Sequence, residues 1–109
     1  MSKCISFEHE GKEYELEYTL RTAGLANADG FVLDELGDKP ALMIPKLVYW
    51  AFNRHHKGLT RKQVEEIYKE AITHKTAFIT ALAELYAEAC GALVGEDEEE
   101  AGNANWTLA

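Results

Sequence analysis

Features that would mark an enzyme, a membrane protein or a secreted protein are scarce in this chain of 109 residues. Its two cysteines, Cys4 and Cys90, lack C-x-x-C spacing, so we expect reduced thiols of a cytosolic protein. No apolar run approaches the roughly 18 residues of a membrane span. No apolar segment follows the start, so we expect no signal peptide.

Motifs for catalysis and cofactor binding are also lacking. The only serines, Ser2 and Ser6, lie on no glycine-rich elbow, and the sequence has no phosphate-binding glycine loop. His55 and His56 are adjacent and would diverge by about 100° on a helix. The remaining histidines have no ligand-like spacing to this pair. We therefore predict no enzyme, no catalytic residue, no cofactor and no metal site, although either cysteine could meet a histidine in space.

The charge is strongly acidic. Lys and Arg number 11 against 19 Asp and Glu, which gives a formal net charge of −8. Such a balance disfavours non-specific nucleic-acid binding. Because residues 96–100 are all acidic, we predict one domain over 1–95 and an acidic, disordered tail over 96–109. In that tail, Trp106 is either a spare aromatic that packs on the body or an anchor for a partner.

The first eighteen residues predict a β-hairpin with strands over 3–8 and 12–18. Glu10-Gly11 forms a two-residue loop with glycine where a positive φ is favoured. The apolar face of a lone hairpin must pack on something else. We expect the acidic face to stay in water or to meet a basic partner, because like charges oppose each other there. The register places Ile5, Phe7, Tyr14 and Leu16 on the apolar face, and Cys4, Ser6, Glu8, Glu13, Glu15 and Glu17 on the acidic one.

After the hairpin, apolar residues recur at the spacing that is typical of helices. A helix over 20–29 has Thr19 as its cap. A second helix opens at Pro40 and runs to about His56, with either a kink or a fresh start at Pro45. This second helix is apolar over more than half its surface, so it is central in the core or partly an interface. One of its faces carries Ile44, Val48, Ala51, Phe52 and His55, while Tyr49 and Trp50 point elsewhere.

Two more helices complete the pattern. The capping box Thr60-x-x-Gln63 opens the third, and the fourth runs from about Thr76 to Val94. The predicted fold class is therefore α+β, mostly α, with an N-terminal β-hairpin packed on a bundle of about four helices and a flexible acidic C-terminal tail.

A basic cluster brackets the turn between the second and third helices. It is either a solvated corner or a docking patch for an acidic surface, which a second copy of the chain could supply in a homo-oligomer. Tyr49, Trp50 and the neighbouring apolar positions of the second helix form another candidate surface, and the acidic tail with Trp106 is a candidate for contact with a second partner. The candidate partner-binding residues are Tyr49, Trp50, Arg54, His55, Lys57, Arg61, Lys62 and Trp106.

Two other functions compete with this interpretation. An acidic decoy would bind a basic host protein through the hairpin carboxylates. A DNA-binding module would place the segment 58–64 in the first helix of a helix-turn-helix. The next helix would then read bases from its first turn over 76–79, which holds no Arg, Asn, Gln or Lys, so we expect no nucleic-acid partner.

The order of motifs resembles the small tail assembly chaperones of long-tailed bacteriophages and related prophages. The matching features extend over nearly the whole chain and are structural in kind. They are Gly11-Lys12-Glu13-Tyr14-Glu15-Leu16, then Gly30-Phe31-Val32-Leu33-Asp34-Glu35-Leu36, Lys39-Pro40 with Pro45, Ala51-Phe52-x-x-His55-His56, Leu82-Ala83-Glu84-Leu85-Tyr86, and the acidic tail that ends near Trp106.

This resemblance implies a non-enzymatic protein of the host cytoplasm that is absent from the finished virion. Such proteins coat the tape measure protein, keep its amphipathic helices soluble and recruit tail tube protein around it. The implied partners are therefore the tape measure protein and the tail tube protein, with no membrane and no nucleic acid. An acidic body with excess aromatic surface is compatible with that role.

Overall fold

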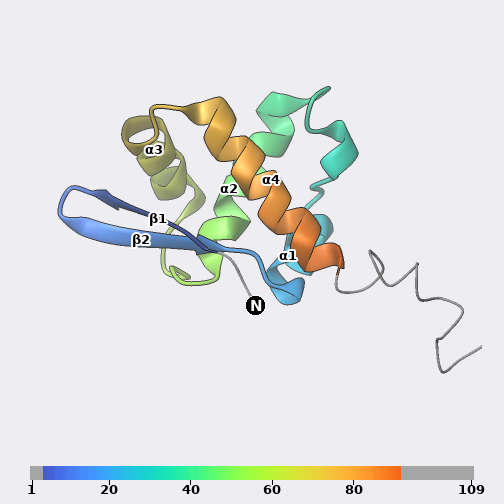
Figure 1. The fold of residues 1–109 in the computed structure, drawn as a ribbon, viewed down its shortest axis with the longest axis horizontal. Coiled ribbons are helices and arrows are strands. Elements are labelled where there is room, and N and C mark those ends of the chain that lie inside the picture. The colour runs from blue at the N-terminus through green and yellow to red at the C-terminus, as the bar shows by residue number, and fades with distance from the viewer. Residues whose placement is uncertain (1–3, 92–109) are drawn as a thin grey trace, which may run out of the picture.

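The computed structural model of the chain describes residues 4–91. In Figure 1 the hairpin lies along one side, α4 lies at the front, and α2 runs through the middle of the bundle. The predicted fold class, a hairpin packed on four helices, is confirmed. The described elements are β1 (Cys4–His9), β2 (Lys12–Glu17), α1 (Leu20–Ala28), the short 3-10 helix η1 (Leu33–Glu35), α2 (Pro40–Asn53), α3 (Arg61–Ala71) and α4 (Lys75–Gly91).

Three expectations fall outside residues 4–91. They are the acidic tail over 96–109, the place of Trp106, and the end of the fourth helix near Val94.

The hairpin has the register that its sequence predicts. Phe7 pairs with Tyr14 and Cys4 pairs with Glu17 across two antiparallel strands. Glu10 and Gly11 have φ values of 54° and 80°, the positive values that a type I′ turn requires. The apolar face packs on the bundle, since Tyr14 and Leu16 are buried there.

Capping interactions start α1 and α3. The Thr19 hydroxyl accepts a hydrogen bond from the Thr22 amide, and the Thr60 hydroxyl accepts one from the Gln63 amide. In return, the amides of Thr19 and Thr60 donate to the side chains of Thr22 and Gln63. The predicted capping box of the third helix is therefore confirmed. Gly30, at a φ of 104°, follows the end of α1 in a conformation that residues with a side chain rarely adopt.

Helix α2 is continuous through Pro45, so of the two alternatives at this residue, a kink or a fresh start, the fresh start is wrong. Pro45 lies on an exposed side of the helix, where its ring displaces no core residue. Pro45 has no amide hydrogen, so the Ala41 carbonyl receives no hydrogen bond from it.

Helix α2 ends at Asn53, about one turn before the predicted end near His56. The amides of His55 and His56 both donate to the Phe52 carbonyl. This tight turn carries the two imidazoles away from the helix and toward the hairpin.

The core forms around α2, which is one of the two alternatives that its apolar composition left open. The helix contacts β2, α1, α3 and α4, so it is covered on several sides. Its buried set differs from the predicted single face, because Met43 and Leu47 are buried whereas Ile44 is half-buried and His55 meets the hairpin. The largest fully buried side chains are Phe31, Phe52, Leu16, Leu47 and Leu82.

Candidate partner-binding site

An arginine and two aromatic residues from the predicted site contact one another. The guanidinium carbon of Arg61 lies 4.3 Å from the Tyr49 ring centroid and 5.7 Å from that of Trp50. Arg61 and the Trp50 indole both donate to the Asp29 carboxylate, at 2.8 and 3.1 Å. These contacts join α1, α2 and α3, so Tyr49, Trp50 and Arg61 have partners within the chain.

The environment of Asp29 favours its charged form. Partial burial by itself raises the pKa of this carboxyl, but the hydrogen bonds from Arg61 and Trp50 outweigh it. The net result is a pKa below the ordinary value.

The two histidines pack against the acidic face of the hairpin. His55 Nε2 lies 2.8 Å from Glu17 Oε1 and 4.0 Å from Glu15 Oε2. The Glu15 amide donates to His56 Nε2 at 3.1 Å. Glu17 is only 6% exposed, so the expectation that this face stays in water or meets a partner is wrong at its Glu17 end. The cause is the turn after α2, which brings the protein's own histidines over the strand.

The position of His56 predicts a pH-dependent stability. Burial, with Lys12 and His55 nearby, lowers the pKa of His56, and its Nε2 accepts a hydrogen bond only while neutral. Its contribution is present above the unfolded pKa of about 6.5 and is lost as pH falls through the lower folded value. The urea midpoint should therefore decrease below about pH 6.5, and His56→Gln, whose amide oxygen can accept the same bond, should flatten the decrease.

A matched variant checks this assignment. His74→Gln removes an exposed imidazole and should keep the pH slope of the unchanged protein. Equal slopes in the His56→Gln, His74→Gln and unchanged proteins would count against the role of His56.

The rest of the basic cluster is divided between two surfaces. Arg54 and Lys57 are exposed beside a polar depression that Thr19 and Arg21 also line. Lys62 lies on α3, at a different opening. The predicted cluster is therefore not one continuous patch, because the turn after α2 separates its members.

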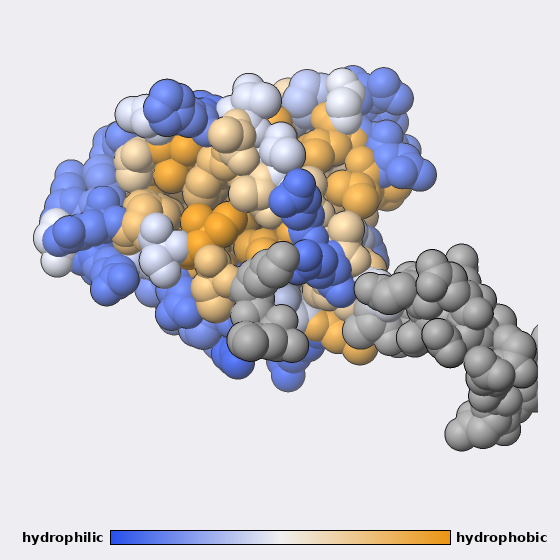
Figure 2. Space-filling model, in the orientation of Figure 1, coloured by the Kyte–Doolittle hydropathy of each residue, from blue (hydrophilic) through white to orange (hydrophobic). Residues whose placement is uncertain are grey.

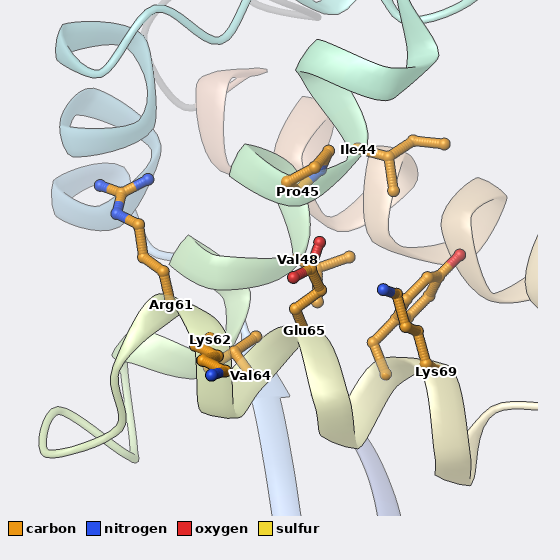
Figure 3. Close-up of a pocket in the computed structure, with 9 residues that line it drawn as sticks. Ile44, Pro45, Val48, Arg61, Lys62, Val64, Glu65 and Lys69 are labelled. Carbon is orange, nitrogen blue, oxygen red and sulfur yellow. The ribbon is translucent and has the colours of Figure 1, made fainter.

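An apolar groove with a volume of about 330 Å³ lies between α2 and α3. Ile44, Pro45 and Val48 line it from α2. Figure 3 shows Pro45 and Val48 above Glu65, while Arg61 is directed away toward α1. The lining from α3 is Arg61, Lys62, Val64, Glu65, Tyr68 and Lys69. Sequence reasoning did not find this groove, because Ile44 and Val48 alone indicate a core-facing stripe.

A second apolar surface lies on the face of the molecule shown in Figure 2, where apolar side chains gather around α4. Ala81 and Ala83 are half-buried and Ala87 is exposed. Small residues on this helix leave room for close approach by another helix.

Two groups of side chains with metal-ligand chemistry were missed by the sequence analysis, and the first also contains a cysteine. Atoms of Cys4, Glu17 and His55 lie within 4.8 Å of one another. The hairpin register places Cys4 beside Glu17, but the return of His55 over both is a tertiary contact. A second such group comprises His9, Glu10 and Glu70.

Comparison with known families identifies the chain as a member of one family. It belongs to the family described as Domain of unknown function (DUF5055), which matches residues 1–109. No curated protein and no solved structure gave a match. Among residues 4–91, no helix combines the length and the apolar character needed to cross a membrane.

Proposed function

We propose that this protein is a tail assembly chaperone of the long-tailed phage type. In this role it is a non-virion protein of the host cytoplasm that binds helical segments of the tape measure protein and promotes tail tube assembly. It works by holding other chains and performs no bond chemistry. The sequence resemblance supports the class, and the groove between α2 and α3 supplies a surface for the tape measure segment.

The groove is the observation that carries the proposal. Its floor is apolar and open to solvent, which suits the apolar stripe of an amphipathic helix. Ile44, Pro45 and Val48 supply the apolar side chains of this lining from α2.

The charged side chains at the rim of the groove indicate which charges the bound segment should carry. Lys62 and Lys69 lie on α3 and are exposed. Seven residues separate them, which is about 10.5 Å along a helix. A helix running along α3 with carboxylates seven residues apart would meet both ammonium groups. The expected occupant is therefore an amphipathic segment whose apolar stripe is flanked by Asp or Glu on the side of Lys62 and Lys69, and by a neutral or basic residue where Glu65 lines the groove.

The two alternative functions receive less support. The decoy interpretation needs accessible carboxylates on the hairpin; Glu8 and Glu13 are exposed, but Glu17 is buried against His55 and is lost to such a surface. The DNA-binding interpretation needs donors at the start of α4, and Lys75 there donates to the Ile72 carbonyl at 2.7 Å.

Co-expression with the tape measure protein encoded in the same genome tests the proposal. We expect the tape measure protein to stay soluble and to co-purify with this chain. The double variant Lys62→Glu/Lys69→Glu should weaken co-purification about tenfold at low salt, because it replaces attraction with repulsion at the groove rim. Ile44→Glu, which places a charge on the apolar floor, should have at least the same effect.

The matched control is Arg54→Glu/Lys57→Glu. It makes the same change in net charge at two exposed residues beside the polar depression. We expect it to bind as the unchanged protein does, with circular dichroism confirming that every variant is folded. A tape measure protein that stays insoluble would contradict the proposed function. If Arg54→Glu/Lys57→Glu lost binding while Lys62→Glu/Lys69→Glu kept it, the assignment of the groove as the binding site would be contradicted.

A further inference from the structure

Four side chains with metal-ligand chemistry converge where the open end of the hairpin meets the turn after α2. Cys4 comes from β1, Glu15 and Glu17 come from β2, and His55 follows α2. Cys4 is opposite Glu17 in the register, and Glu15 lies two residues from Glu17 on the same face. Three separate segments therefore deliver sulfur, nitrogen and oxygen donors to one place.

The donor atoms are close enough to share one ion. Ligand atoms of Cys4, Glu17 and His55 all lie within 4.8 Å of one another. His55 Nε2 is 2.8 Å from Glu17 and 4.0 Å from Glu15. Glu17 is 6% exposed, so one of these carboxylates is held in a largely dry place. The imidazole of His55 is a hydrogen-bond partner of this buried carboxylate within the chain.

The same cluster could also be interpreted as a cysteine nucleophile with a histidine base. The electrostatics oppose that interpretation. A hydrogen bond with Glu15, burial and the charge of Glu17 raise the pKa of Cys4 to about 11, so the thiol stays protonated near neutral pH. A nucleophilic cysteine needs the opposite shift. A bound divalent cation has the opposite effect on the thiol, because a thiol that coordinates the cation loses its proton.

We propose that Cys4, Glu17 and His55, with Glu15 as the fourth ligand, form a Zn²⁺ site. The donor set selects the ion, since zinc binds thiolate, imidazole and carboxylate, whereas magnesium and calcium prefer oxygen alone. The ion ties both strands to the turn after α2 and so fixes the hairpin on the bundle. This proposal does not depend on the partner-binding groove, which lies between α2 and α3.

The second group of donors provides an internal comparison. His9, Glu10 and Glu70 also approach one another but offer no sulfur. The side chains of Glu10 and Glu70 are 78% and 62% exposed. In the proposed site Cys4 and His55 are also exposed, but Glu17 is buried, so the second group differs in lacking both sulfur and a buried carboxylate. We expect this group to bind zinc weakly or not at all.

Metal titration of the full chain tests the site. The reduced, chelator-treated protein is titrated with Zn²⁺ by calorimetry and with Co²⁺ by absorption spectroscopy. We expect one ion per chain, a sulfur-to-cobalt charge-transfer band and a higher melting temperature with zinc. Cys4→Ser should remove the charge-transfer band. It should also weaken zinc binding by about 100-fold or more, because the loss of a residue that only supports a ligand already weakens metal binding by about 10- to 100-fold.

Control variants separate this site from other donors. Cys90→Ser removes the other thiol and should keep the band, and His9→Gln should keep the zinc affinity. His55→Gln should weaken zinc binding as Cys4→Ser does, with circular dichroism confirming the fold of each. The proposal is overturned if zinc does not saturate at one ion per chain. It is also overturned if Cys4→Ser binds as tightly as the unchanged protein, or if His9→Gln is the variant that loses binding.

Discussion

Replacing Phe52 with alanine is expected to destabilise the protein by about 3–5 kcal/mol, the range found for large aromatic residues in cores. Phe52 is 1% exposed and lies where the hairpin meets α2. Its ring centroid is 5.7 Å from that of Tyr14 and 6.1 Å from those of Phe7 and His56. Truncation leaves a cavity under the hairpin and removes these ring contacts. Urea unfolding followed by circular dichroism measures the loss.

A control on the same helix separates this effect from a general sensitivity of α2. Leu42 is 53% exposed, so Leu42→Ala should change stability by no more than about 0.5 kcal/mol. If Phe52→Ala cost less than about 1 kcal/mol, the hairpin would not depend on this contact with the bundle.

Replacing Asp29 with alanine is expected to cost about 1–3 kcal/mol, because two donors lose a charged acceptor. Arg61 donates to Asp29 at 2.8 Å and the Trp50 indole donates at 3.1 Å. Asp29 also follows the last residue of α1, so the change loosens the junction of α1 with α2 and α3. A double-mutant cycle with Arg61→Ala measures the coupling, for which we expect about 0.5–2 kcal/mol.

The effect of pH on the destabilisation caused by Asp29→Ala shows whether the destabilisation comes from the loss of the Asp29 charge. The folded pKa of Asp29 is lowered, so its contribution is present above the unfolded value of about 3.9 and is lost as pH falls through the folded value. The stability gap between the unchanged protein and Asp29→Ala should therefore close in acid.

A surface ion pair provides the comparison for this cycle. Glu35 and Lys39 are 3.7 Å apart with both side chains substantially exposed, so their coupling should be below about 0.5 kcal/mol. Equal coupling energies for the two pairs would contradict the structural role of Asp29.

Local rules were sufficient to predict the hairpin and the helix starts. The register follows from the Glu10-Gly11 turn together with period-two alternation, and both the turn and the pairing are as predicted. The third helix begins at Thr60 because its hydroxyl and the Gln63 side chain satisfy end amides. Each of these features depends on residues that are close in sequence.

The details of the site depend on contacts between distant residues, which is why the sequence did not show them. His55 and Glu17 are 38 positions apart, and only the early end of α2 brings them together. The basic cluster is continuous in sequence but divided in space, because Arg61 turns back to Asp29 while Arg54 and Lys57 face another side. The groove needs two helices to form, so neither stripe alone indicates it.

The central claim is that the groove between α2 and α3 holds a helical segment of another chain. The direct measurement is a chemical-shift map of the isotope-labelled protein, titrated with an amphipathic, acid-flanked segment of the tape measure protein. The account predicts saturable shifts at Ile44, Val48, Tyr68 and Lys69, with the signals of Arg54 and Lys57 unmoved. Shifts confined to the hairpin or to Arg54 and Lys57, or no shifts at all, would contradict it.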